Sequence, residues 1–252
     1  MTTPADQSLD FAERWLRDSL SVLHAAFSVA QITVDMTQAM QRLEHFRRSG
    51  AQVTSTHLLV SAAARALAAN PNLHQLIAGT KRHRPSSVDI GLSISGETFV
   101  APVLVIEGAD KKTVAEIAEE TARRVPAAQQ ANQQTLRALR RWGWLVPFAF
   151  LRRAVLRLQF SSARFRRKTA GTFQVSTVPV DWALTSTLVT AGVLIGGRIW
   201  PRVVAVDGQP SVRPMMSLTL SGDHGVWDGR AAARFLAAVQ MELESVHETA
   251  AT

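Results

Sequence analysis

Residues 217–243, SLTLSGDHGVWDGRAAARFLAAVQMEL, constrain the fold most, because they join a strand, a turn and a helix within one short stretch. The alternating apolar start is typical of a strand, and the Ala-rich segment after Gly229 predicts a helix. The turn between them holds His224 and Asp228. A histidine at the mouth of a strand, with a carboxylate four residues on, suits a fixed general base.

The rest of the chain mixes helices and strands without regular βαβ units. Apolar periodicity predicts helices over 11–26, 37–48, 57–69 and 111–124. It predicts strands over 27–34, 89–95, 98–105, 172–178, 187–195, 203–206 and 212–220. Val206-Asp207-Gly208-Gln209 is a hairpin signal between the last two strands. This order predicts an α+β fold in which helices flank a largely mixed or antiparallel sheet.

The amino-acid composition excludes several kinds of chemistry. The chain has 252 residues, 46% of them apolar, and no cysteine, which excludes disulfides, cysteine nucleophiles and thiolate metal sites. The N-terminal residues lack the basic and apolar regions of a signal peptide, and no run of about 18 uncharged apolar residues predicts a membrane span. We therefore expect a cytoplasmic protein.

The positive charge is concentrated in one part of the chain. The net charge is +8, yet residues 121–180 contain twelve Lys and Arg residues and no Asp or Glu, so the remainder is mildly acidic. A general nucleic-acid binder is therefore disfavoured. Binding of nucleic acid through residues 137–168 would require a steep salt dependence, and no known nucleic-acid motif accompanies the charge.

The basic segment also contains an apolar helix signal. Trp142 and Trp144 precede Pro147, after which Phe148, Leu151, Val155 and Leu158 recur at helical spacing, with Arg153 and Arg157 on another face. Such a basic amphipathic helix indicates a membrane-surface or partner-binding element within residues 137–168, which would suit a lipid or long-chain acyl substrate. A solvated face or a contact between subunits are alternatives.

Several strings together resemble one enzyme family. They are His224-Gly225-Val226-Trp227-Asp228-Gly229, Val206-Asp207-Gly208, Val212-Arg213-Pro214-Met215-Met216, Gly171-Thr172-Phe173-Gln174-Val175-Ser176, and Asp89-Ile90-Gly91-Leu92 with Val100-Ala101-Pro102-Val103. The chain resembles the catalytic domain of dihydrolipoamide acyltransferases of 2-oxo acid dehydrogenase complexes, in the chloramphenicol acetyltransferase-like superfamily. The likeness spans residues 11–244.

The resemblance implies a single catalytic domain over residues 1–252, with a basic insert at about 126–168, and a homotrimer or multiple of trimers with active sites between subunits. His224 would be the general base and Ser176 the oxyanion donor, 48 positions apart. Asp228 would hold the turn closed by Gly229 through Arg14 or Arg17, between which the sequence does not choose. Coenzyme A or acyl-CoA would be a substrate, with no metal.

The chain departs from the family pattern in three places. Gly225 replaces the arginine that usually follows the histidine, and residues 179–184 replace the family's Pro- and Asn-containing loop. No lipoyl domain precedes the catalytic region, so we expect no attached lipoyl group and a standalone, CoA-dependent acyltransferase. The alternative is a catalytically idle trimeric scaffold that docks partners or membrane through the basic insert.

Less specific roles remain open for the same residues. His224 could be an ordinary turn histidine, and Ser176 an ordinary strand serine. Asp228 could serve only as the N-cap of the following helix. A metal site of Asp223, His224 and Asp228 is disfavoured because no second histidine cluster supports it.

Overall fold

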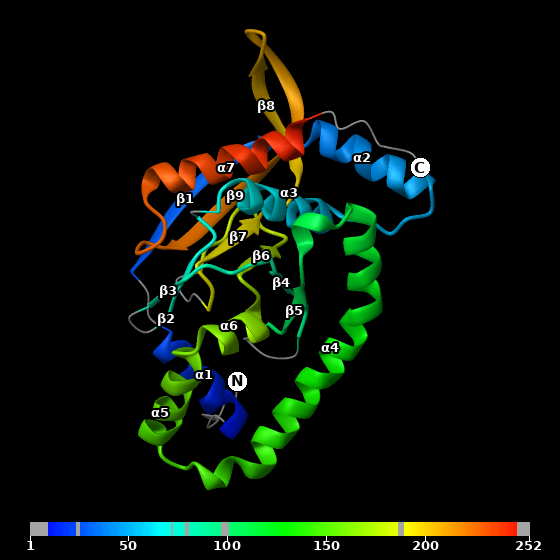
Figure 1. Ribbon diagram of the computed structural model, residues 1–252. Helices are drawn as coiled ribbons and strands as arrows, with labels where there is room; N and C mark the ends of the chain where they lie inside the picture. The colour runs from blue at the N-terminus through cyan, green and yellow to red at the C-terminus, as the bar shows by residue number, and fades with distance from the viewer. Residues whose placement is uncertain are drawn as a thin grey trace, which may run out of the picture.

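A computed structural model of the chain describes residues 10–23, 26–71, 73–78, 81–96, 101–185 and 189–245 (Figure 1). The α-helices are α1 (Phe11–Val22), α2 (Thr37–Arg48), α3 (Ser55–Ala69), α4 (Val114–Trp142), α5 (Ala149–Phe160), α6 (Ala163–Ala170) and α7 (Gly229–Glu244). Two 3₁₀ turns are η1 (Ala109–Lys111) and η2 (Gly143–Leu145). The strands are β1 (Phe27–Asp35), β2 (Leu76–Ala78), β3 (Lys81–His83), β4 (Ile90–Ser93), β5 (Val103–Ile106), β6 (Phe173–Thr177), β7 (Gly192–Gly196), β8 (Trp200–Val206) and β9 (Gln209–Asp223).

Seven strands form one mixed sheet in the order β1–β9–β7–β6–β4–β5, with β8 paired to the first half of β9. Strand β6 runs parallel to both of its neighbours, β4 and β7, and the other pairs are antiparallel. Strands β2 and β3 form a separate antiparallel pair. The expected α+β class with a mixed sheet flanked by helices is confirmed.

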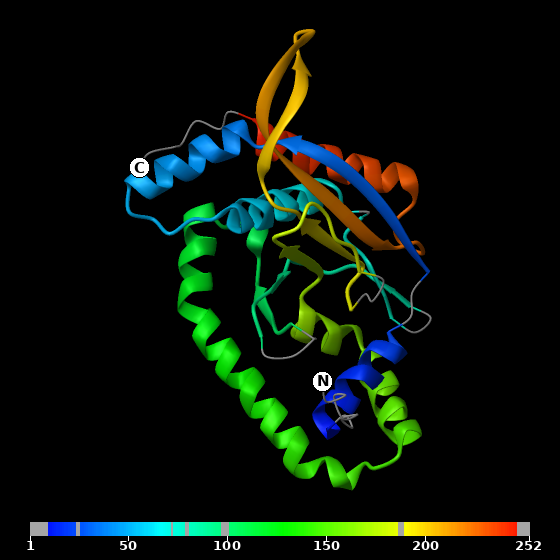
Figure 2. The same cartoon turned by 180° about the vertical axis from the view of Figure 1, so that it is seen from behind.

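Helices α3 and α7 lie side by side over one face of the sheet, and Figure 2 shows β1 and β9 from the opposite side. Ten of the 15 residues of α3 are buried, as its Ala-rich sequence predicts. Small side chains at Ala62, Ala63 and Ala66 let the helix approach the strands closely, while Phe235 and Val239 of α7 fill the adjoining space. The core therefore lies between this helical layer and the sheet.

The β8–β9 hairpin projects from the body of the molecule (Figures 1 and 2). Its turn is the predicted one: Asp207 and Gly208 have φ of 50° and 78°, the left-handed pair that a two-residue hairpin requires. Val203 and Val212 are paired across it and are 72% and 67% exposed. Two β-branched side chains thus stand in solvent on this hairpin.

The structure confirms some of the predicted helix and strand bounds and contradicts others. Helix α2 has the predicted bounds, and Gly50 beyond it has φ of 82°. The helix expected to end at Arg124 instead continues through Pro126 to Trp142, because the following Ala, Gln, Leu and Arg residues favour helix and outweigh the hydrogen bond lost at proline. Expected strand residues 98–100 and 187–188 lie outside the described residues.

Helix α5 exposes three of the four apolar residues that the sequence placed on a binding face, and a different face packs inward. Arg152 and Leu156 are buried, whereas Phe148, Leu151 and Leu158 are exposed. The reason is an ion-pair cluster with α1: Arg152 Nε and Arg153 Nε each donate to the Asp18 carboxylate at 2.8 Å. A buried arginine paired with a residue 134 positions away leaves no local sequence signal.

Asp18 is 4% exposed, and its carboxylate joins the start of the chain to α5. Burial raises the pKa of Asp18, but the hydrogen bonds from Arg153 and Arg152 outweigh this effect, so the pKa lies below its ordinary value. Arg152 also donates to the Pro147 carbonyl at 2.7 Å and lies over the Phe11 ring. The position of α5 therefore depends on an ionised Asp18.

We predict that Asp18→Asn lowers the free energy of unfolding by about 3–5 kcal/mol, because the Arg152 guanidinium stays buried without its counter-charge. Denaturant unfolding at neutral pH measures the loss. Asp181→Asn, which breaks the exposed pair with Arg198, is the control and should cost less than about 1 kcal/mol.

The difference between wild type and Asp18→Asn should shrink as the pH falls. The pKa of the Asp18 carboxyl is lower in the folded state than its unfolded-state value of ~3.9, so the ionised carboxylate stabilises the fold at pH values above ~3.9. This contribution is lost as the pH falls through the lower folded-state pKa. A difference that stays constant down to pH values well below ~3.9 would contradict the role assigned to the carboxylate.

Candidate active site

His224 lies in the tight turn that follows β9. The Asp223 carboxylate accepts from Gly225 N at 2.9 Å, and the Asp223 carbonyl accepts from Val226 N and Trp227 N at 2.8 Å. The His224 N–H donates to the Ala26 carbonyl at 2.5 Å, just before β1. The backbone of the histidine is thus held from both sides, while its side chain is exposed.

The ring of His224 has a defined orientation. Its Nδ1 lies 2.9 Å from the Trp227 carbonyl oxygen, and because a carbonyl can only accept, Nδ1 must carry the proton. In the neutral ring this assigns the free lone pair to Nε2. The geometry therefore provides a proton acceptor on an exposed residue, held in one tautomer, as a general base requires.

Trp227 fixes this carbonyl by being fully buried. Its ring contacts Phe173 of β6 and Phe235 of α7, with centroid distances of 5.9 Å and 5.1 Å, and those two rings are 5.3 Å apart. Gly222 lies under the indole, where a Cβ would come 3.1 Å from Trp227 Cγ. Sheet, turn and helix therefore meet at one aromatic cluster.

Ser176 lies on β6, on the face of the sheet away from α3 and α7. Phe173 and Val175 belong to the core beneath the helices, and Thr177 Oγ1 lies 2.8 Å from Thr56 Oγ1 of α3. Alternation then directs Ser176 to the other face. Within the described part of the chain its half-buried hydroxyl has no hydrogen-bond partner, so it is available as a donor.

The start of β6 is anchored by a buried polar cluster. Thr172 N donates to the Asp89 carbonyl at 2.6 Å, and Thr172 Oγ1 lies 2.6 Å from His74 Nε2. Gly171 before it has φ of 75°, and a Cβ there would be 2.4 Å from the Asp89 carbonyl oxygen. Glycine is therefore required where the chain enters the strand that carries Ser176.

His224 and Ser176 do not meet within one chain. Ser176, Ile195 and Thr219 form one row across β6, β7 and β9, and His224 follows Thr219 by five residues. Five strand residues span about 17 Å and two strand spacings about 10 Å, which separates the two side chains by roughly 20 Å. Any direct cooperation between them needs a second copy of the chain.

Asp228 is the N-cap of α7, because its carboxylate accepts from Ala231 N. No described residue forms an ion pair with it. Of the two arginines expected to bind it, Arg14 lies over the Phe11 ring and Arg17 has an exposed side chain on α1. Gly229 is the first residue of α7, and a Cβ there would meet no atom within 4 Å, so crowding does not require glycine.

Sequence reasoning missed Arg82 on β3. Its Nη2 donates to the Gly225 carbonyl at 3.0 Å and its Nη1 to Gln75 Oε1 at 3.1 Å. A Cβ at Gly225 would lie 2.9 Å from Ile77 Cδ1, which leaves little room for an arginine there. The Arg82 guanidinium, from another strand, thus lies beside the histidine turn. No local sequence motif predicts this contact.

We predict that Asp228→Ala lowers the free energy of unfolding by about 1 kcal/mol, whereas Asp228→Asn leaves it nearly unchanged, because asparagine is an equally good N-cap. Thermal or denaturant unfolding of the two variants measures this. Equal losses in both would contradict a capping role and favour a requirement for the carboxylate charge.

Comparison with known proteins identifies the family. The model of the 2-oxoacid dehydrogenases acyltransferase (catalytic domain) family matches residues 14–138 and 189–251, most of the chain. The chain therefore belongs to this family. The unmatched residues 139–188 contain α5, α6 and Ser176, so the family match includes His224 and Asp228 but not the candidate oxyanion donor.

Among curated proteins, the chain is 29% identical over 220 residues to the dihydrolipoyllysine-residue succinyltransferase component of the 2-oxoglutarate dehydrogenase complex of Bartonella vinsonii subsp. berkhoffii. That alignment covers 84% of this chain and 46% of the relative. The chain thus spans about half the length, or less, of the first curated relatives that it matches.

Solved structures share the fold. A probable dihydrolipoamide acetyltransferase from Listeria monocytogenes superposes with a TM-score of 0.76 at 20% identity, covering 98% of this chain and 97% of that one. The dihydrolipoamide acetyltransferase of Azotobacter vinelandii gives 0.72 at 21%, covering 96% and 92%. A chloramphenicol acetyltransferase gives 0.53 at 15%, covering 97% and 100%. The chloramphenicol acetyltransferase-like fold is therefore confirmed.

Proposed function

We propose that the protein is an acyltransferase that moves an acyl group from a coenzyme A thioester to an acceptor, with His224 as the general base. The orientation of His224 carries the proposal: Nδ1 of this exposed residue donates to the Trp227 carbonyl, and Nε2 is left to accept a proton. In the Azotobacter relative, a serine, a histidine and an asparagine have been studied for their role in catalysis. Its histidine and asparagine are four positions apart, like His224 and Asp228.

The chemistry needs only a base and an oxyanion donor. Nε2 of His224 takes the proton from the acceptor thiol, hydroxyl or amine as that group attacks the thioester carbonyl. The Ser176 hydroxyl of a neighbouring subunit donates to the oxyanion of the tetrahedral intermediate. When the intermediate collapses, the carbon–sulfur bond breaks, and the imidazolium returns the proton to the leaving thiolate. Neither a metal nor a covalent enzyme intermediate is needed.

Assembly of several copies is part of the proposal, because one chain holds His224 and Ser176 far apart. The projecting β8–β9 hairpin supports it, since the exposed Val203 and Val212 offer an apolar face to another subunit. A trimer, as the family resemblance implies, would repeat the same site at each of its contacts.

We predict that His224→Ala lowers kcat/KM by about 10²–10⁴-fold, the range for loss of a general base. Ser176→Ala should lower kcat by about 10²–10³-fold with little change in KM, because the serine acts on the transition state. Release of free CoA thiol from acyl-CoA, assayed with a panel of acceptors, measures both. Met241→Ala, an exposed change on α7, is the control. Turnover that is equal in wild type and His224→Ala would refute the assignment and favour a catalytically idle scaffold.

Mixing the two inactive variants tests whether the site lies between subunits. Co-assembled His224→Ala and Ser176→Ala chains should recover about one quarter of wild-type activity, because random assembly joins an intact histidine to an intact serine at about that share of sites. No recovery in mixed oligomers verified by mass spectrometry would show that the two residues do not act together across a contact.

A further inference from the structure

The segment from the end of α4 through α5 carries an unusual number of exposed apolar side chains. Six of the fifteen large hydrophobic residues that are exposed within the described residues lie between positions 142 and 158. They are Trp142, Leu145, Phe148, Phe150, Leu151 and Leu158, which we call the α5 surface. Such a cluster marks an interaction site, because single exposed residues scattered over a surface are the ordinary case.

Helix α5 has two apolar sides. The inward side holds Leu156 and the paired Arg152 against α1. At 100° per residue, Phe150, Ala154 and Leu158 lie on the opposite side, with Leu151 next to them. Phe150 and Leu158 are 72% and 75% exposed, so the second side has no partner within the described chain. Phe148 extends it by stacking on Phe150, with a centroid distance of 5.6 Å.

Positive charge borders these side chains. Arg157 lies about 20° round the helix from Phe150. Arg141 lies over the Trp142 ring at 5.2 Å, and neither arginine forms an ion pair with any residue that the structure describes. The side chain of the neighbouring Arg153 is 46% exposed although it binds Asp18. No acidic residue occurs between positions 121 and 180 to neutralise them.

This positive charge indicates which kind of partner binds the α5 surface. A contact that placed this surface on its own equivalent in a second copy would bring Arg157 and Arg141 of the two chains close together, which like-charge repulsion opposes. An anionic bilayer suits both the positive charge and the exposed apolar side chains, since its headgroups neutralise arginine and its fluid interior accepts irregular apolar side chains.

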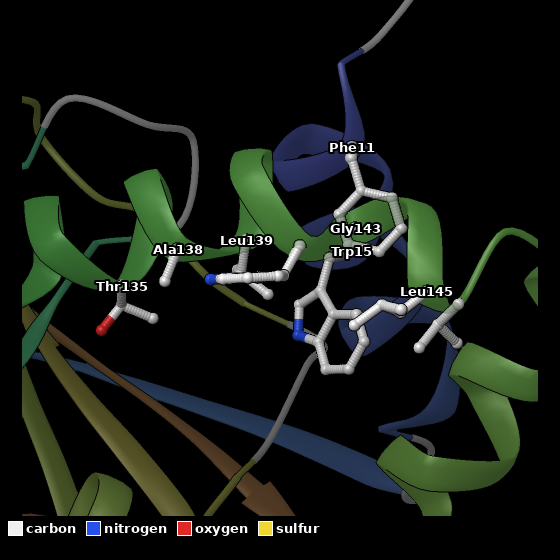
Figure 3. Close-up of a pocket in the computed structure, with 9 residues that line it drawn as sticks. Phe11, Trp15, Thr135, Ala138, Leu139, Gly143 and Leu145 are labelled. Carbon is white, nitrogen blue, oxygen red and sulfur yellow. The ribbon is translucent and has the colours of Figure 1, made fainter.

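A cavity of about 420 Å³ continues the apolar surface inward, between α1, the end of α4 and η2. Figure 3 shows Phe11 and Trp15 of α1 facing Leu139 and Leu145 across it. Trp142 and Leu145 belong both to the cavity wall and to the α5 surface. The size suits part of one acyl chain. The side chain of Trp144, the second tryptophan of this segment, lies outside the described residues.

We propose that the α5 surface, with Arg141 and Arg157, binds the face of an anionic lipid bilayer. Phe148, Phe150 and Leu158 enter the boundary between headgroups and acyl chains, and the arginines contact lipid phosphates. Attachment is peripheral: the helices that the structure describes include none long and apolar enough to cross a membrane. This inference does not depend on the role of His224.

Flotation of the full chain with lipid vesicles tests the proposal. We expect binding to phosphatidylcholine vesicles that contain phosphatidylglycerol, little binding to phosphatidylcholine alone, and release at high salt. The double variant Phe150→Ser with Leu158→Ser should bind at least tenfold more weakly. Met40→Ser with Met241→Ser, an equal loss of exposed apolar residues on α2 and α7, should bind like wild type.

A second pair of variants tests the charges. Arg141→Gln with Arg157→Gln should weaken binding to the anionic vesicles and reduce its salt dependence, whereas Arg47→Gln with Arg84→Gln, also exposed, should not. An unchanged unfolding midpoint verifies that each variant is folded. The proposal is overturned if wild type binds neither vesicle, or if control and test variants lose binding equally. It is also overturned if wild type binds only an acidic polypeptide such as polyglutamate, or if Phe150→Ser with Leu158→Ser dissociates an oligomer instead.

Discussion

Burial of Trp227 is the constraint on which the candidate site depends. The indole occupies the space between β6, β9 and α7, so the backbone on either side of it cannot move independently of the core. Its carbonyl oxygen is therefore a fixed acceptor, and the His224 ring takes its orientation from that oxygen. The ring of His224 is thus held as firmly as a core side chain, although it lies in a surface turn. The arrangement separates two tasks, since the tryptophan provides rigidity and the histidine stays open to solvent.

Much of the fold could be predicted from sequence because its signals are local. The bounds of α2 and the Asp207-Gly208 turn follow from capping and backbone preferences that act within a few residues. One error arose where a distant residue decides, because nothing near Arg152 shows that this arginine is buried against Asp18. The end of α4 was misplaced for a local reason, since the helix-favouring residues after Pro126 outweigh the hydrogen bond lost at proline. The apolar residues that the sequence placed on the outer face of α5 are exposed, except for the half-buried Val155, but the buried arginine on the other side of the helix was not predicted.

The candidate site, like the fold, could be predicted from the sequence only in part. The motif around His224 and Asp228 indicated a strand end, a turn and a capped helix, and the structure has all three. Ser176 was found through its strand motif, yet its relation to His224 follows only from the register of β6, β7 and β9. Arg82 could not be predicted at all, because it reaches Gly225 from a strand 143 positions earlier in the chain. Local sequence therefore describes the parts of the site, and topology decides how many subunits are needed to complete it.

The pairing of β1 with β9 has a consequence for biosynthesis. Phe27 lies opposite Asp223, so this pairing at the edge of the sheet joins two segments that lie far apart in the sequence. The same contact holds the histidine turn, through the Ala26 carbonyl. During translation, β1 is synthesised long before β9. Until β9 is available, β1 has no pairing strand, and its backbone hydrogen-bonding groups are unprotected. The histidine turn can therefore assume its working shape only after both β1 and β9 have been synthesised, and closure of so distant a contact makes folding slow.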